Sequence, residues 1–104
     1  MEILKKVYIA GPMTGYENYN RESFHSAAEC VTENGHTALN PAILPDGLTQ
    51  AQYMDICFAM IRAADAIYLL DGYSKSKGAL AELAYAEKLE LDIIYQNILE
   101  PALA

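Results

Sequence analysis

The chain of 104 residues has few cations and no long apolar run, and both shortages exclude whole classes of function. Lysine and arginine total 7 against 14 aspartate and glutamate residues, which gives a formal net charge of −7. A protein that binds DNA or RNA needs a basic surface to replace the counterions of the phosphates, so we expect no nucleic-acid partner. No apolar run approaches the roughly 18–20 residues of a membrane-spanning helix, so we expect no membrane partner either.

Cysteine and metal-ligand patterns are equally sparse. Cys30 and Cys57 are too few for a disulfide framework, and we interpret them as buried, reduced thiols in a cytoplasmic protein. His25 and His36 have no cysteine or histidine partner at the spacing of metal ligands, so we expect neither a metal site nor a cofactor. The first residues lead directly into a strand-like run, and we therefore expect no signal peptide.

The composition is that of a folded protein, because 53% of the residues are hydrophobic and 20% are charged. The length predicts a single domain over residues 1–104. Strand-like runs alternate with helical periodicity, with strands predicted over 4–10, 36–40, 66–70 and 91–95 and helices over 20–33, 50–63 and 78–89. Thr49 is predicted to cap the second of these helices, and the tail at 96–104 to add a short helix or a subunit contact. This alternation predicts an α/β fold, a doubly wound (Rossmann/flavodoxin-like) three-layer sandwich with a mainly parallel sheet of about four strands.

Ligands of such folds bind outside the carboxyl ends of the strands, which here means the loops at 11–18, 40–48 and 71–77. The first loop continues the run Tyr-Ile-Ala-Gly-Pro-Met-Thr-Gly at 8–15. Its glycines would let backbone amides approach a phosphate or a sugar closely. The run matches neither the Walker pattern nor G-x-G-x-x-G, and an ordinary tight turn is the alternative interpretation.

Glu82 is the carboxylate of most interest, because it falls near the start of the third predicted helix. Ser76 is placed to cap that helix, and Gly78 keeps its first turn open. The helix dipole favours the ionised form of Glu82, which a carboxylate nucleophile needs. Its helical neighbours are mostly small, so the carboxylate could face a cavity. The alternative is an ordinary solvated glutamate.

The remaining polar candidates have weaker patterns. We expect Asp65, before a buried strand, to bond the backbone there, and Asp55 to be a surface charge. Four tyrosines fall near the predicted site and could stack on a base or simply pack, namely Tyr8, Tyr16, Tyr19 and Tyr73.

Three motifs in a fixed order are more specific than any single residue: YIAGPMTG, AADAIYLLDG and SKGALAELAYA. Together, from about residue 6 to residue 95, they resemble the nucleoside 2-deoxyribosyltransferase-like superfamily. The resemblance is greatest to its small members found often in phage and prophage genomes. It implies a small-molecule nucleoside or nucleotide ligand and a homo-oligomer, a dimer or higher.

The resemblance also implies a chemistry and a set of site residues. In this family a glutamate on the third helix attacks the anomeric carbon of a 2-deoxyribosyl group, and a second acid protonates the departing base. By motif position Glu82 is the nucleophile. The substrate-binding residues implied are Tyr8, Gly11, Pro12, Met13, Thr14, Gly15, Ser76 and Gly78. The logic is that of two-carboxylate glycoside cleavage.

The sequence departs from the family pattern at the acid. The family often carries an aspartate on the second helix eight residues before the position of Asp65, and Cys57 stands there instead. Asp55 lies about 200° further around that helix and cannot substitute. We name Asp71, at the carboxyl end of the third predicted strand, as a candidate accessory acid. Without a second acid the chain could also be slow or inactive.

A second position bears on the ligand. Nucleoside transferases of the family tend to have an aspartate six residues before the nucleophile, whereas related deoxynucleotide hydrolases tend to have a serine. This chain has Ser76, flanked by Lys75 and Lys77, which favours a 5′-monophosphate over a free nucleoside.

Three functions therefore remain open from the sequence. The first is an enzyme that cleaves or exchanges an N-glycosidic bond through Glu82. The second is a non-catalytic nucleotide-binding or sensing module, which Cys57 supports because the acid is missing. The third is a structural or interaction domain acting through self-association, for which the small size leaves room.

Overall fold

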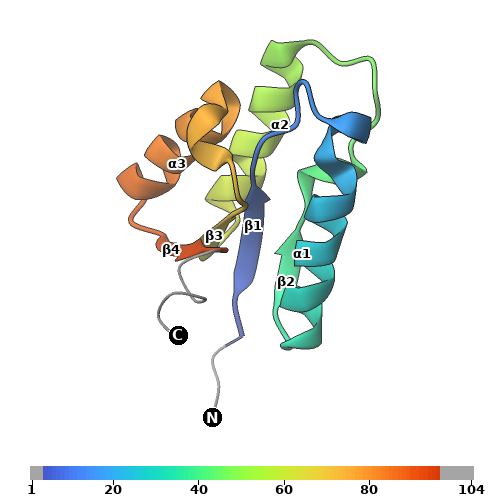
Figure 1. Cartoon of the computed structure of the whole chain (residues 1–104). Helices are drawn as coiled ribbons and strands as arrows, with labels where there is room; N and C mark the ends of the chain where they lie inside the picture. Colours follow the sequence, from blue (N-terminus) through green and yellow to red (C-terminus); the bar gives the residue numbers. More distant parts are fainter. Residues whose placement is uncertain (1–3, 97–104) are drawn as a thin grey trace.

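The computed structural model describes residues 4–96 as a parallel sheet covered by helices on both faces (Figure 1). The strands are β1 (Lys6–Ala10), β2 (Thr37–Leu39), β3 (Ala66–Leu69) and β4 (Asp92–Tyr95). The helices are α1 (Arg21–Glu33), α2 (Gln50–Arg62) and α3 (Lys77–Lys88), with short 3₁₀ turns η1 (Glu17–Asn20), η2 (Pro41–Ile43) and η3 (Tyr73–Lys75).

The strand order is β2-β1-β3-β4, and each neighbouring pair is parallel. This confirms the predicted α/β class with its parallel four-stranded sheet. The predicted boundaries lie within two residues of the observed ones, because the ends of helices and strands are the least determined by periodicity. The predicted short helix or subunit contact at 96–104 lies outside the described residues beyond Gln96.

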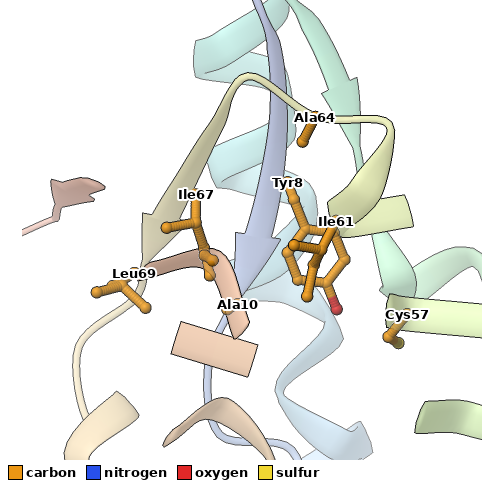
Figure 2. Packing of buried hydrophobic residues seen from close by; sticks show 8 residues of the cluster. Tyr8, Ala10, Cys57, Ile61, Ala64, Ile67 and Leu69 are labelled. Atoms are coloured by element: carbon orange, nitrogen blue, oxygen red, sulfur yellow. The ribbon is translucent and has the colours of Figure 1, made fainter. Parts of the chain in front are cut away.

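The core has two halves because alternate residues of a strand point to opposite faces of the sheet. On one face Tyr8 packs with Cys57 and Ile61 of α2 and with Ala86 of α3. On the other face Ile9 packs against buried residues of α1. Figure 2 shows the first cluster, with the Tyr8 hydroxyl on the side of Cys57. The alternation along β1 therefore sends Tyr8 to the face that α2 and α3 cover.

Local polar bonds fix the helix ends as the sequence predicts. Thr49 begins α2 with a capping box that it forms with Gln52. Ser76 begins α3 by accepting a hydrogen bond from the amide of Ala79 at 3.1 Å. Asp65 accepts a hydrogen bond from the amide of Lys6 at 2.9 Å, which confirms its predicted backbone role.

The two cysteines differ, which corrects one expectation. Cys57 is buried, whereas Cys30 is exposed on α1. The buried stripe of α1 includes Ala27 and Val31, and Cys30 lies about 100° around the helix from Val31. Burial of both thiols was therefore a wrong prediction. Within residues 4–96, no helix has the length and apolar character needed to cross a membrane.

Candidate active site

A cavity of about 690 Å³ opens where the loops after β1 and β2 meet the amino end of α3. This is the edge of the sheet at which the sequence predicts a site. Its size is within the ordinary range for small-molecule sites. The residues that line it include Tyr8, Gly11, Pro12, Met13, Thr14, Tyr16, Tyr19, Arg21, Asp46, Tyr53, Cys57, Lys75, Ser76, Lys77, Gly78 and Glu82.

Glu82 lies inside this cavity and is hydrogen-bonded at its wall. Its side chain is on the second turn of α3 and is 8% exposed. The hydroxyl of Tyr8, a residue with no exposed surface, donates a hydrogen bond to Oε2 of Glu82 at 2.9 Å. This hydrogen bond links β1 to α3 and fixes the orientation of the Glu82 carboxyl group in the cavity.

Burial decides the protonation of Glu82. Loss of solvent raises the pKa of the Glu82 carboxyl from its usual 4.5 to about 7, although its polar contacts with Tyr8 and Cys57 act in the opposite direction. The dipole of α3 predicts a preference for the ionised form, whereas the net shift of the Glu82 pKa is upward because the carboxyl is desolvated.

Cys57 completes a buried group of three with Tyr8 and Glu82. It is 6% exposed, and burial raises the pKa of its thiol to about 11, opposed by its contact with Tyr8. Burial, with the nearby Glu82 charge, also raises the pKa of the Tyr8 hydroxyl well above its usual value. At neutral pH the carboxylate therefore has two uncharged neighbours that keep their protons.

The loop after β1 forms one wall of the cavity. Gly11 and the three residues after it line the cavity, whereas Gly15 does not. A Cβ at Gly11 would lie 2.8 Å from Cβ of Leu70, so the glycine is required where the ends of β1 and β3 approach. Gly15 has φ of +86° and makes the turn. The backbone of this loop therefore requires glycine at both positions whether or not a ligand binds there.

The amino end of α3 also lines the cavity. Ser76, Gly78 and the two flanking lysines, Lys75 and Lys77, all line the cavity. Ser76 already accepts a bond from the backbone, but its hydroxyl proton remains available for a ligand. This wall combines a helix N-terminus with two cations, an arrangement that favours an anionic group.

Sequence reasoning missed the rim formed by Arg21 and Asp46. The guanidinium of Arg21 bonds the carboxylate of Asp46 and lies 5.3 Å from the ring centre of Tyr19. The turn that leads to Arg21 holds Asn18, Tyr19 and Asn20 at positive φ, a conformation that asparagine tolerates better than most residues. The two asparagines were the only visible pattern for this turn. The ion pair joins residues 25 positions apart, which no local pattern shows.

Other sequence candidates lie outside the cavity. Asp71 is exposed, and its amide donates a hydrogen bond to the side chain of Gln96 at 2.8 Å. The structure therefore does not bring Asp71 to Glu82, and its role as accessory acid stays a prediction. Asp55 is exposed on α2, and Tyr73 packs near Tyr95 instead of lining the cavity. Among residues 4–96 no group of three or more His, Cys, Asp or Glu could hold a metal ion.

Comparison with solved structures identifies the class of fold. A solved structure described as "2-desoxiribosyltransferase from Leishmania mexicana" superimposes with a TM-score of 0.71 at 22% sequence identity. The similarity covers 88% of this chain and 63% of that chain, so the present chain spans less than two thirds of that protein. This is a deoxyribosyltransferase-like α/β fold.

Within that class the chain belongs to the family described as "Domain of unknown function (DUF4406)", which matches residues 5–95. The match includes the loop after β1, Cys57 and Glu82. No curated protein matches the chain.

Proposed function

We propose that the chain cleaves the N-glycosidic bond of a 2′-deoxynucleoside or its 5′-monophosphate, with Glu82 as the nucleophile. The observation that carries the proposal is the hydrogen bond from Tyr8 to Glu82 inside the cavity. A carboxylate held by one oxygen is oriented for attack through the other. With a pKa of about 7, a substantial part of the Glu82 population is ionised at neutral pH.

The reaction has two balanced steps. An oxygen of Glu82 bonds to the anomeric carbon, the carbon–nitrogen bond breaks, and its electron pair leaves with the base. Water or a second base then attacks the same carbon, and the carboxylate of Glu82 leaves. Water as acceptor gives hydrolysis and releases a proton, whereas a base as acceptor gives transfer.

The wall at the amino end of α3 supports a phosphorylated substrate. Lys75 and Lys77 bring two positive charges, and Ser76 brings a hydroxyl, to a helix N-terminus that lines the cavity. A phosphate there would be attracted by both lysines and by the helix dipole. In the proposal this wall holds the 5′-phosphate while Glu82 faces the anomeric carbon.

Base release tests the proposal directly. Purified protein is incubated with the natural 2′-deoxynucleosides, their 5′-monophosphates and the corresponding 7-methylguanine derivatives, with and without an acceptor base, and free base is separated by chromatography. Glu82→Gln is the test variant. Glu87→Gln is its matched control, because Glu87 is an exposed glutamate on the same helix. Release that Glu82→Gln abolishes and Glu87→Gln retains is the expected result, and absence of release from every substrate would overturn the proposal.

A non-catalytic nucleotide-binding module is the second candidate, and Cys57 is the observation that favours it. The thiol occupies the position where the resemblance implies an acid, and it keeps its proton at neutral pH. Isothermal titration calorimetry with the same nucleotides would identify this function through binding that leaves the ligand intact after long incubation.

A further inference from the structure

We propose, on the basis of the proposed function, that Cys57 restricts the site to N-glycosides whose base is positively charged and leaves without receiving a proton. The substrate class is an N-alkylated purinium or a pyridinium glycoside. Cys57 acts as a specificity-determining residue because it stands beside Glu82 in the cavity and supplies no carboxylic acid for a neutral base.

The described residues bring few carboxyl groups to the cavity. Among residues 4–96, the carboxylates that line it are Glu82 and Asp46. Asp46 is exposed at the rim, where its carboxylate is paired with the guanidinium of Arg21 and not directed at Glu82 by any hydrogen bond of the described residues. Glu82 is assigned to the anomeric carbon and must be ionised to attack it. No second carboxyl group of this described part of the chain is placed to protonate a departing base.

The two groups beside Glu82, Tyr8 and Cys57, are poor proton donors for a departing base. The hydroxyl proton of Tyr8 is already donated to the carboxylate. The thiol of Cys57 is 6% exposed, and its high pKa makes it a poor proton donor near neutral pH. Both groups stabilise the ionised nucleophile, because their polar contacts lower the pKa of Glu82 against the effect of burial. These contacts oppose burial only in part, since the pKa of Glu82 is still raised to about 7, and neither neighbour is a strong acid.

The electron balance of the first step shows which substrate such a site serves. When the carbon–nitrogen bond breaks, the base receives the bonding pair. A neutral base becomes an anion unless an acid protonates it, and this protonation is typically worth about 10²–10⁴-fold in rate. A base that carries a positive charge is neutralised by the same electron pair and departs without a proton. The second step then adds water to the anomeric carbon and releases one proton to solvent.

The surroundings of the cavity suit a cationic base. Tyr16 and Tyr53 line it, and aromatic faces attract cations. The cations that line the cavity have anionic partners in the proposal, because Arg21 is paired with Asp46 and the two lysines of the α3 wall face the phosphate.

A matched pair of substrates tests the inference. 7-Methyl-2′-deoxyguanosine and 2′-deoxyguanosine differ by one methyl group, which makes the first base cationic. We expect kcat/KM to be at least about 100-fold higher for the methylated substrate, because general acid catalysis for the neutral one is missing. Uncatalysed loss of the methylated base is subtracted with Glu82→Gln measured in parallel.

Cys57→Asp supplies a readout that a merely structural role would not move. The acid should raise kcat/KM for 2′-deoxyguanosine by at least about tenfold while changing the methylated substrate much less, so the selectivity ratio falls. Cys57→Ser, which replaces the thiol with a hydroxyl and adds no acid, is the matched control. It should keep the ratio of kcat/KM between the methylated and the unmethylated substrate high. The wild-type comparison remains decisive even where Cys57→Asp fails to fold.

The outcomes separate this inference from the proposed function. Glu82-dependent cleavage with a wild-type ratio below about 100-fold would overturn the inference and leave the proposed function standing. A Cys57→Asp variant that folds but slows both substrates equally would also overturn it. Absence of Glu82-dependent cleavage of either nucleoside and of their 5′-monophosphates would overturn the proposed function as well.

Discussion

The hydroxyl of Tyr8 donates a hydrogen bond to Glu82 across 74 positions of sequence, and both side chains are buried. This bond connects the central strand β1 to the helix α3. A buried carboxylate is costly when ionised, and hydrogen bonds to its charged form offset part of that cost. The pair therefore influences both the stability of the fold and the state of the proposed nucleophile.

Tyr8→Phe should destabilise the protein more above the pKa of Glu82 than below it. The hydroxyl favours the ionised carboxylate, so its removal raises the pKa of Glu82 further. We expect a loss of about 1.5–3 kcal/mol near pH 8, the range of hydrogen bonds to charged groups, and a smaller loss near pH 5. Urea unfolding at the two pH values measures it.

The matched control for this prediction is Tyr85→Phe. Tyr85 lies on the same helix as Glu82 and stacks on Phe58 through its ring, with ring centres 4.4 Å apart. Removal of the Tyr85 hydroxyl should cost little at either pH. Equal losses for Tyr8→Phe at both pH values would contradict the role assigned to its hydroxyl.

Ionisation of Glu82 should lower the stability of the fold as the pH rises. The folded-state pKa is about 7 and the unfolded value 4.5, so the folded chain binds more protons between these values. The stability contributed by the protonated form is fully present below about pH 4.5 and is lost as the pH rises through about 7. Its size is on the order of 3 kcal/mol.

Glu82→Gln isolates this effect, because glutamine keeps the shape and cannot ionise. The variant should be more stable than the wild type near pH 8, and the difference should shrink toward pH 4.5. Paired unfolding curves across this range give the result. A difference that does not change with pH would place the carboxylate in contact with water and refute its burial.

Gly11→Ala should destabilise the chain by about 1–3 kcal/mol, the usual cost of forcing extra volume into a packed core. The new methyl group would lie 2.8 Å from Cβ of Leu70. Gly78→Ala is the matched control, since the nearest atom to its added Cβ is the Ser76 hydroxyl at 4.0 Å. That change should be neutral or stabilising, as alanine is the better helix former. Thermal unfolding of the two variants compares them, and equal midpoints would refute the close approach at Gly11.

Ser76 should have separable roles in stability and in ligand binding. Ser76→Ala removes the cap of α3 and should cost about 1 kcal/mol. Ser76→Asp keeps a good capping group and should preserve stability, while its charge repels a phosphate. The aspartate variant should therefore lose affinity for a 5′-monophosphate but not for the free nucleoside, measured by calorimetry. Equal losses of affinity for both ligands would contradict phosphate binding at the amino end of α3.

Several features of the fold were predictable because they depend on local patterns. The apolar run of β3 and the capping residues Thr49 and Ser76 indicated where elements begin and how they alternate. Parallel pairing then followed from the alternation of strands and helices. The homo-oligomer and the phage or prophage association stay predictions.

The site was less predictable, because its properties arise between distant elements. The position of Glu82 on α3 could be inferred, but its burial depends on Tyr8 and α2 packing over it. The dipole of α3 is a property of one helix, whereas the upward shift of the Glu82 pKa comes from desolvation by the elements packed around it. The pairing of Arg21 with Asp46 crosses from α1 to a separate loop and has no sequence pattern.

The order of the sheet has a consequence for how the protein folds. β1 pairs with β3, where Val7 lies beside Ala66, and a parallel pair can form only after the intervening chain has closed into a loop. Such distant pairings slow folding relative to helical bundles of the same length. The cavity lined by Tyr8 of β1 and Glu82 of α3 cannot form until that closure is complete. Recovery of ligand binding during refolding should therefore follow the final cooperative phase, in which β1 and β3 pair.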